Sequence, residues 1–289
     1  MDEKILEWLL EEDTPEVRLR TLKEYLKLSD DDTKVIECKN KLLQSKVYER
    51  ALKKLEKEKP WAKFDAIMAF AEWGLTRADI GSDIDEEVFS LIQSTGFKML
   101  CGEPYLLRNL VKLGYYQVDI VKEEIGCMLG RIKEDGEFGC ISSNKKTNDP
   151  KKPHKSCARL TVEYLLLVAE LHLLGIECEC ESALVHYFTK RNIFYRTDNI
   201  EAPMVDVMLE TFYPSDPIKV GVQNIVYALR VLGCPGESEA MQAGYEVLNR
   251  HRLDNGRYLL TASKSVPAFK AGKVGEENKW ITLYAYMAQ

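Results

Sequence analysis

Apolar residues recur at helical spacing along almost the whole chain, whereas no segment shows sustained alternation of period two. Residues 15–28 are the first clear case, because Pro15 follows the N-cap candidate Thr14 and apolar residues recur every three or four positions. Residues 35–59 continue the pattern with lysine and glutamate on the opposite face, and Pro60 ends the run. The pattern predicts an all-helical protein.

Glycines mark a period in the chain beyond residue 60. Four of them end apolar segments and suit the left-handed residue that follows a helix: Gly74, Gly114, Gly175 and Gly233. A second turn follows about 22 residues later in each unit, at Gly96, Gly136, residues 197–199 and Gly256. A period of this length indicates repeated pairs of helices.

The two predicted helices of each unit differ in polarity. The first is apolar over most of its surface, as buried helices are, and the second is amphipathic, as half-buried helices are. The first helices are predicted to begin near Trp61, Cys101, Cys157, Lys219 and Asn278, and the second near Asp83, Val118, Glu181 and Glu237. This alternation predicts an α/α toroid, which has two concentric layers and here about six helix pairs. We expect one structural domain, with residues 1–58 as an N-terminal helical segment packed onto the repeats at 59–289.

The repeated unit resembles that of a known superfamily. Its order of inner helix, glycine, outer helix and Asp-Gly-x-aromatic turn is similar to the repeat of terpenoid cyclases and protein prenyltransferases, and residues 135–138 and 254–258 carry the likeness. The chain looks like small bacterial prenyltransferase-like or squalene-cyclase-like proteins at 16–22, 101–157 and 278–283. The resemblance implies an α/α toroid that binds an isoprenoid or another apolar ligand in a central cavity.

The chain departs from the catalytic motifs of these families. Squalene-type cyclases protonate their substrate with an Asp-x-Asp-Asp motif, and the nearest stretches here are residues 30–32 and 83–86. Both precede predicted helices, where acidic side chains stabilise the helix N-terminus. No stretch reproduces the Asp, Cys and His ligands of the prenyltransferase zinc ion. The resemblance therefore supplies no complete catalytic motif, and whether the protein is an enzyme stays open.

Aromatic residues on the predicted inner helices are the candidate ligand-binding residues. They are Trp61, Trp73, Tyr105, Tyr164, Tyr227 and Trp280. Their ring faces could line a central cavity and stabilise cations, and core packing is the alternative interpretation of the same residues.

A cluster of cysteines and one histidine is a candidate metal site. A segment of about twenty residues without hydrophobic periodicity separates an outer from an inner helix, and segments this long are usually functional or disordered. It contains Cys140 and His154 and ends at Cys157, and Cys101 begins the preceding inner helix. These four side chains have the chemistry of zinc ligands, so we predict zinc as a cofactor. The alternative is that the cysteines are ordinary buried residues.

Composition limits the partners of the chain. Its 40 Lys and Arg residues against 46 Asp and Glu give a net charge of −6, so no overall basic surface favours nucleic acid. Charges within the first ten residues are not typical of a signal peptide. The most apolar stretch, residues 160–174, is shorter than the roughly 20 residues that span a bilayer. Eight cysteines without a secretory signal favour reduced thiols, and we expect a cytoplasmic protein.

Three functions remain open on this basis. The leading hypothesis is a prenyltransferase- or terpenoid-cyclase-like protein that binds an isoprenoid or other apolar ligand. The first alternative is a non-enzymatic helical-repeat interaction module with an exposed binding groove. The second is an α/α-barrel carbohydrate-active enzyme that uses acids such as Asp198, Glu201 and Asp206. The oligomeric state is open in all three.

Overall fold

All regular elements of the described chain are helices. The computed structural model describes residues 1–57, 59–81, 84–94, 98, 100–140, 156–263 and 272–289. The α-helices are α1 (Glu3–Leu9), α2 (Pro15–Arg20), α3 (Thr33–Leu43), α4 (Lys46–Leu55), α5 (Pro60–Glu72), α6 (Arg77–Ile80), α7 (Asp85–Gln93), α8 (Gly102–Lys112), α9 (Asp119–Leu129), α10 (Ala158–Leu173), α11 (Glu181–Thr189), α12 (Val222–Val231), α13 (Glu239–Asn249) and α14 (Lys279–Met287). A π-helix, η1 (Thr21–Tyr25), continues α2, and η3 (Tyr115–Gln117) and η5 (Asp206–Leu209) are 3-10 helices. Among these residues, β-pairing is limited to isolated bridges, and no helix has the length and apolarity needed to cross a membrane. The prediction of an all-helical protein is confirmed.

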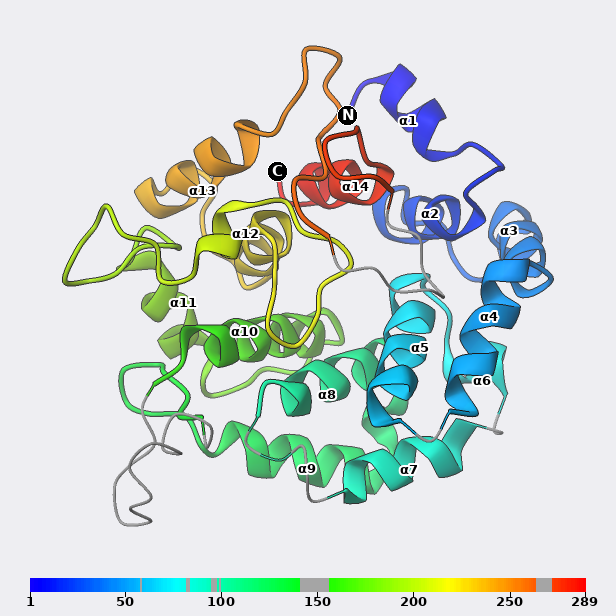
Figure 1. Ribbon diagram of the computed structural model, residues 1–289, viewed down its shortest axis with the longest axis horizontal. Helices are drawn as coiled ribbons and strands as arrows, with labels where there is room; N and C mark the ends of the chain where they lie inside the picture. The colour runs from blue at the N-terminus through cyan, green and yellow to red at the C-terminus, as the bar shows by residue number, and fades with distance from the viewer. Residues whose placement is uncertain (58, 82–83, 95–97, 99, 141–155, 264–271) are drawn as a thin grey trace.

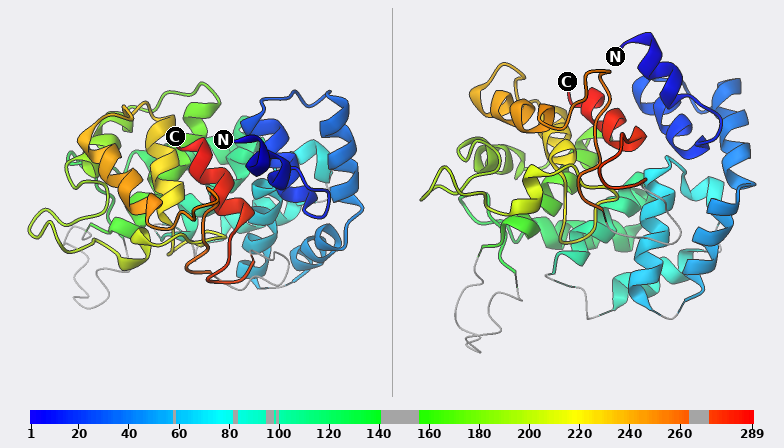
Figure 2. Two further views of the ribbon diagram at one scale, coloured as in Figure 1. Left: turned by 90° about the horizontal axis from the view of Figure 1, so that it is seen from above. Right: turned by 45° about the horizontal axis from the view of Figure 1, so that its top comes forward.

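Helices α5, α8, α10, α12 and α14 lie toward the middle of the molecule, and we call them the inner helices (Figure 1). Each of them contacts the next in this order. Helix α14 also contacts η1, so the C-terminal helix lies beside the N-terminal segment, as further views show (Figure 2). Helices α4, α7, α9, α11 and α13 lie at the periphery (Figure 1). The predicted helix starts agree with those observed to within three residues.

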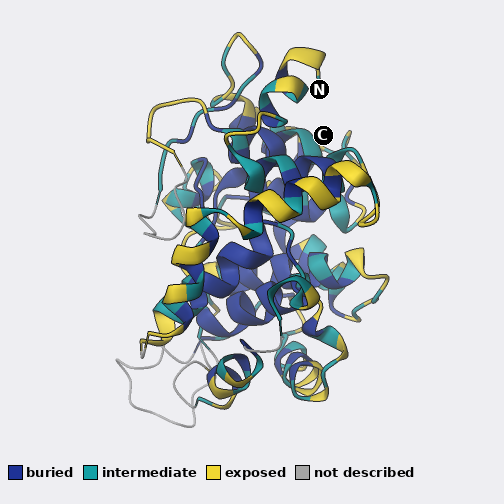
Figure 3. Cartoon of the chain, turned by 90° about the vertical axis from the view of Figure 1, so that its right-hand side faces the viewer, coloured by how far each residue is buried: buried dark blue, intermediate teal, exposed yellow. Residues whose placement is uncertain are grey.

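Burial follows this arrangement, with buried residues in the middle and exposed ones on the peripheral helices (Figure 3). Helix α10 is buried at every position from 160 to 169, whereas α13 buries only one face. The prediction that the helix at 160–174 is more buried than the helix at 237–250 is confirmed. The two helices differ because α10 packs between α8 and α12, while α13 contacts α12 from outside.

Two helix predictions near the N-terminus were wrong in detail. Residues 35–59 form two helices, because Ser45 accepts a hydrogen bond from the backbone N–H of Tyr48 (3.2 Å) and begins α4 after α3 has ended. The amphipathic spacing continues across this break and so conceals it. Residues 15–28 are α-helical only to Arg20 and then continue as η1, and Lys27 beyond it has a φ of 56°.

The Asp-Gly-x-aromatic turn predicted from the sequence is built alike in two repeats. Gly136 donates to the carbonyl of Lys133 at 3.0 Å, and Gly256 donates to that of Leu253 at 2.9 Å. The aromatic residue that follows each turn is fully buried. Its backbone N–H donates to a threonine hydroxyl on the next inner helix, from Phe138 in one repeat and from Tyr258 in the other. Each turn therefore joins a peripheral helix, α9 or α13, to the helix that follows it, α10 or α14, by the same contacts.

Gly136 allows its turn to pack directly on α11. A Cβ atom there would lie 2.3 Å from the carbonyl oxygen of Ala183, and the φ of Gly136 is 82°. Gly114 has a similar φ of 87°, but a Cβ atom at this position would meet nothing within 4 Å. We expect Gly114→Ala to cost about 1–2 kcal/mol of unfolding free energy through backbone strain alone. Gly136→Ala should cost about 1–3 kcal/mol more, because α11 must move away. Urea denaturation of the two variants measures the difference, and equal losses would contradict the contact.

Candidate functional site

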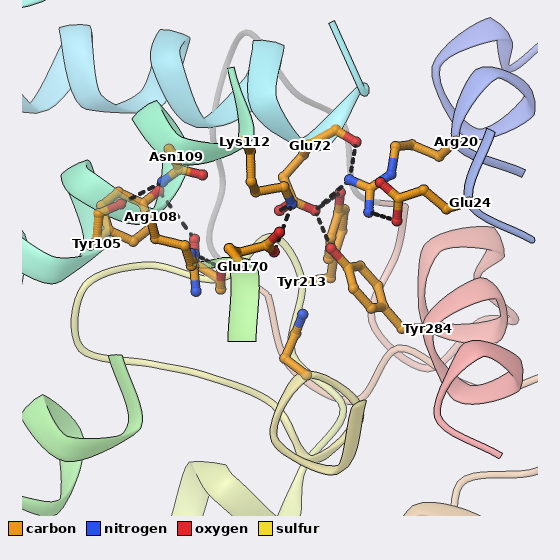
Figure 4. Close-up of polar contacts among 12 residues, drawn as sticks. Arg20, Glu24, Glu72, Tyr105, Arg108, Asn109, Lys112, Glu170, Tyr213 and Tyr284 are labelled. Carbon is orange, nitrogen blue, oxygen red and sulfur yellow. Dashed lines mark hydrogen bonds and ion pairs between the residues drawn. The ribbon is translucent and has the colours of Figure 1, made fainter. Parts of the chain in front are cut away.

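A buried carboxylate lies at the meeting point of four helices. Glu72, the last residue of α5, accepts hydrogen bonds from the Tyr284 hydroxyl at 2.7 Å and the Tyr213 hydroxyl at 3.2 Å. Its other oxygen pairs with the Lys112 ammonium at 2.7 Å. The guanidinium of Arg20 lies 3.9 Å from the oxygen that accepts from the two tyrosines. The same guanidinium donates to the backbone carbonyl of Glu72 at 2.7 Å. Figure 4 shows these side chains converging from α2, α5, α8 and α14.

The charges around Glu72 outweigh the effect of burial. Burial alone would raise the pKa of Glu72, but Lys112, Arg20 and Arg108 lower it to about 2. The carboxylate is therefore ionised across the physiological range. Arg20 in turn pairs with Glu24 one turn later in η1. We call Glu72, Lys112, Arg20 and Glu24, with the neighbouring Glu170, the central ionic network.

Glu170 extends this network from α10. Its carboxylate lies 3.7 Å from Lys112, which it shares with Glu72. Burial raises the pKa of Glu170 above its ordinary value, and the charge of Lys112 opposes the shift. Two carboxyl groups that share one ammonium thus have pKa values shifted in opposite directions. Such a pair is typical of sites where one group stays ionised and the other can hold a proton.

A second buried carboxyl lies two turns earlier on α10. Glu163 is fully buried, and its nearest charge is the guanidinium of Arg108 at 3.4 Å. Neither oxygen of Glu163 forms a hydrogen bond with the described part of the chain. Burial raises its pKa to about 8, against the attraction of Arg108, and the charge of Asp216 adds to the rise. Glu163 is therefore mostly protonated at neutral pH.

The segment that precedes α12 covers one end of the space between the inner helices. Tyr105 donates to the backbone carbonyl of Ser215 at 3.3 Å, and Arg108 donates to the Ser215 hydroxyl at 2.9 Å. Tyr213 stacks on Trp280 with ring centroids 4.9 Å apart. This segment thus fills the space near the beginnings of the inner helices.

A small cavity opens at the opposite end, where the inner helices finish. Its deep part holds only about 20 Å³ and is lined by members of the central ionic network together with Asn224, Tyr227 and Tyr284. A wider part, which we call the mouth, holds about 260 Å³. The two parts share Lys112, Glu170 and Tyr227 as lining residues. The cavity is thus narrow and charged at depth and wider at the surface.

The lining of the mouth combines ammonium groups with exposed leucines. Lys23 and Lys27 from the N-terminal segment lie there together with Lys112. Leu173 and Leu174, at the end of α10, line it with more than half of their surfaces exposed. Both a polar and an apolar part of a ligand would find complementary groups here.

The structure places most of the predicted ligand-binding aromatics away from this cavity. Tyr227 lines both parts of it. Tyr105 and Trp280 contact the segment that closes the other end, and Tyr164 stacks on Phe138. The remaining two are Trp73, which is fully buried, and Trp61, which is 55% exposed. Of the six predicted residues, Tyr227 is therefore the one that a ligand in this cavity would touch.

The structure brings three of the four predicted metal ligands together. The Cys157 thiol forms hydrogen bonds with those of Cys101 and Cys140. His154 lies outside the described residues. Among the described residues, no set of three or more His, Cys, Asp or Glu side chains is already arranged as a metal site. Zinc binding therefore stays a prediction.

A second pair of cysteines lies close together on the outside of the molecule. The Cys178 and Cys180 thiols form a hydrogen bond. They lie in the turn before α11 rather than within the helix, so helical geometry does not separate them. Both line a groove of about 770 Å³ between α9 and α11, which we call the outer groove.

The acids proposed for a carbohydrate-active enzyme lie on the surface. Asp198, Glu201 and Asp206 are exposed, and Asp198 pairs with Arg196 at 2.7 Å. None of the three lines the cavity or the outer groove. The central carboxyl groups were not among the predicted site residues. The pattern that could have indicated them is a charged residue within an otherwise apolar helix, as at Glu72, Glu163 and Glu170.

Comparisons of the chain with protein-family models, with curated proteins and with solved structures find no match.

Proposed function

We propose that the chain is an α/α toroid of two helical layers, similar in class to the prenyltransferase-like and squalene-cyclase-like proteins, whose mouth binds a small amphiphilic anion such as a short prenyl diphosphate. The order of contacts from α5 through α14 to η1 supports the ring, as does the burial of these helices relative to the peripheral ones. We propose the cytoplasm as its compartment. The function rests on the mouth, because there the cavity is wide enough to admit a ligand.

The three lysines that line the mouth together with Glu170 are the observation that carries the proposal. They are Lys23, Lys27 and Lys112. Lys112 is shared with Glu72 and Glu170, Lys23 also pairs with Asp30 at 2.8 Å, and Lys27 is exposed. Ammonium groups bind phosphate oxygens as point charges. Burial raises the pKa of the Glu170 carboxyl, which weakens its repulsion of an oxyanion, and a protonated carboxyl donates a hydrogen bond to such a group. Glu24 also lines the mouth, but its carboxylate forms an ion pair with Arg20, which offsets its negative charge.

The size and the apolar rim of the mouth limit the ligand. Its 260 Å³ lies just below the usual range of ligand pockets, about 300–1,000 Å³. The deep part of about 20 Å³ has room for about one water molecule. Leu173 and Leu174 at the rim can cover a short apolar tail. A short ligand at the mouth therefore fits better than a long isoprenoid within the ring.

Thermal unfolding with a panel of ligands tests this function. We expect geranyl diphosphate to raise the melting temperature more than inorganic diphosphate does, and farnesol to have no effect. A ligand at one hundred times its dissociation constant stabilises a protein by about 2.7 kcal/mol. For a chain of this size, each kcal/mol raises the melting temperature by about 2–4 °C.

Matched variants distinguish ligand binding at the mouth from a general effect of surface charge on the melting temperature. Lys27 is exposed at the mouth, so Lys27→Met should remove most of the shift that geranyl diphosphate produces. Lys190→Met removes an exposed lysine beyond α11 and should leave the shift unchanged. Equal shifts in the two variants, or a larger response to farnesol than to the diphosphates, would contradict the proposed site.

The outer groove favours the interaction module as the second candidate function. It is the larger hollow, at about 770 Å³, and its lining includes Ile125, Leu129, Ile132, Leu171 and Ile176. Helical-repeat proteins bind partners along such surfaces. A panel in which no small ligand shifts the melting temperature would favour this function over the first.

A further inference from the structure

Helices α9 and α13 occupy corresponding places in two repeats, which allows them to be compared position by position. Each is followed by the same turn, so Gly136 corresponds to Gly256, and counting back from these two glycines aligns the helices. The sides that face the inner helices agree in this alignment. Their buried residues are Val121 and Met128 in α9, and Met241 and Leu248 in α13.

The side of α9 that faces the outer groove differs from the same side of α13. The groove-lining residues of α9 and the residue just beyond its turn are Gly126, Leu129, Gly130 and Ile132. The corresponding residues after and within α13 are exposed and polar: Glu246, Asn249, Arg250 and Arg252. The repeat thus accepts charged side chains at these positions when they face water. Apolar surface with a polar rim is typical of an interaction site.

No tertiary contact explains the two glycines. Outside its own helix, a Cβ atom at Gly126 would meet nothing within 4 Å, and a Cβ atom at Gly130 would meet only carbonyl groups of α9, the nearest at 3.6 Å. Neither glycine has a positive φ. An exposed glycine in a helix costs about 1 kcal/mol relative to alanine. The absence of side chains at these positions leaves room for another backbone to approach α9 closely.

The charges in the lining define the kind of occupant that the groove suits. Glu177 and Glu179 are exposed in the turn before α11. The other charged residues of the lining are Lys122 on α9 and, just beyond it, Lys133 and Glu134. Three carboxylates against two ammonium groups leave the groove acidic, with two of the carboxylates together on the side of α11. This distribution complements basic side chains on that side.

We propose that the outer groove binds an amphipathic helix of a partner protein, which presents apolar residues to α9 and basic residues to Glu177 and Glu179. Helix α9 packs on α8 and α11 packs on α10, so the added helix would lie in the peripheral layer between them (Figure 1). Amphipathic helices bind apolar grooves through residues one turn apart. The inference specifies the partner of the interaction module, our second candidate function, and does not depend on a ligand at the mouth.

Two labelled model peptides test the proposal. One has leucine at helical spacing and lysine at the other positions, and the second has glutamate in place of lysine. In fluorescence anisotropy with the full-length chain, the lysine peptide should bind at least about tenfold more tightly than the glutamate peptide. Glu177→Gln/Glu179→Gln should weaken binding of the lysine peptide by about threefold to tenfold, as expected for exposed ion pairs.

A matched pair of double variants locates the binding. Gly126→Glu/Gly130→Arg gives α9 the residues that α13 has at these positions and leaves the net charge unchanged. It should weaken binding of the lysine peptide at least about tenfold, because the new side chains obstruct the groove. Ser182→Glu/His186→Arg places the same side chains one turn apart on α11, at exposed positions outside the lining, and should bind as the native chain does.

Two measurements on Gly126→Glu/Gly130→Arg separate binding from folding and from the mouth. Its urea midpoint should be at least that of the native chain, because both positions have room for a side chain and glycine disfavours helix. Geranyl diphosphate should shift its melting temperature as it shifts that of the native chain. Failure of the native chain to bind the lysine peptide, equal affinities of the two double variants, equal binding of the two peptides, or a lower urea midpoint would overturn the proposal.

Discussion

Replacement of Glu72 by alanine should lower the free energy of unfolding by about 3–5 kcal/mol, as expected when one partner of a buried ionic network is removed. The change leaves Lys112 and Arg20 buried with less compensating charge, and it removes the acceptor of two tyrosine hydroxyls. Urea denaturation followed by circular dichroism measures the loss. Tyr284→Phe, which deletes a single hydrogen bond to the same carboxylate, should cost less.

Two comparisons identify the network as the cause. Glu49→Ala removes a glutamate of an exposed pair with Lys53 on α4 and should leave the urea midpoint unchanged. The double variant Glu72→Met/Lys112→Met should recover part of the loss, because apolar side chains often replace buried ion pairs well. A loss in Glu72→Ala as small as that in Glu49→Ala would contradict the role assigned to Glu72.

The effect of Glu72 also has a defined pH range. Its pKa in the folded chain is about 2, below the ordinary value of 4.5. The native state thus binds fewer protons than the unfolded state in this interval. The stability that Glu72 supplies is present above pH 4.5 and is lost as the pH falls toward 2.

Glu163→Gln should stabilise the protein at high pH and leave its stability nearly unchanged at low pH. The pKa of Glu163 is about 8 in the folded chain against an ordinary value of 4.5. Between these values the unfolded state releases a proton that the native state retains, so stability falls as the pH rises. Glutamine does not ionise, and the variant should therefore exceed the native chain by on the order of 4 kcal/mol at pH 8 and above.

The difference in unfolding free energy between the two chains, measured from about pH 4 to pH 9, tests this expectation. Asp216→Asn removes a negative charge that raises the pKa of Glu163, so it should make the pH-dependent loss smaller. Glu179→Gln, an exposed change before α11, should follow the native chain at every pH. A difference between Glu163→Gln and the native chain that does not vary with pH would show that Glu163 is already ionised when buried.

The central carboxyl groups illustrate what sequence periodicity leaves undetermined. The apolar pattern assigns Glu72, Glu163 and Glu170 to buried helices, but it contains no information about which cations neutralise them. Tyr284 is 212 residues from Glu72, and Tyr213 is 141 residues away. Arg20 comes from the N-terminal segment, which the sequence indicated only as a segment packed onto the repeats.

The proximity of Cys101, Cys140 and Cys157 was easier to predict from the sequence. Cys101 and Cys157 were placed at the beginnings of two inner helices, and the repeat puts such beginnings at the same end of the molecule. The structure adds the contacts of the Cys157 thiol with Cys101 and Cys140, which no spacing rule provides.

The sequence by itself determined the all-helical class, the helix order, the two kinds of helix and the repeated turn. Each of these depends on interactions within a few residues: the 3.6-residue spacing of apolar side chains, glycine after a helix, and Asp-Gly in the turn. Only the tertiary structure decided that the middle of the molecule is ionic, that the predicted aromatics mostly pack in the core, and that the cavity opens at the ends of the inner helices. Those features depend on which side chains from distant helices meet in a medium of low polarity, where a charge must be paired or protonated.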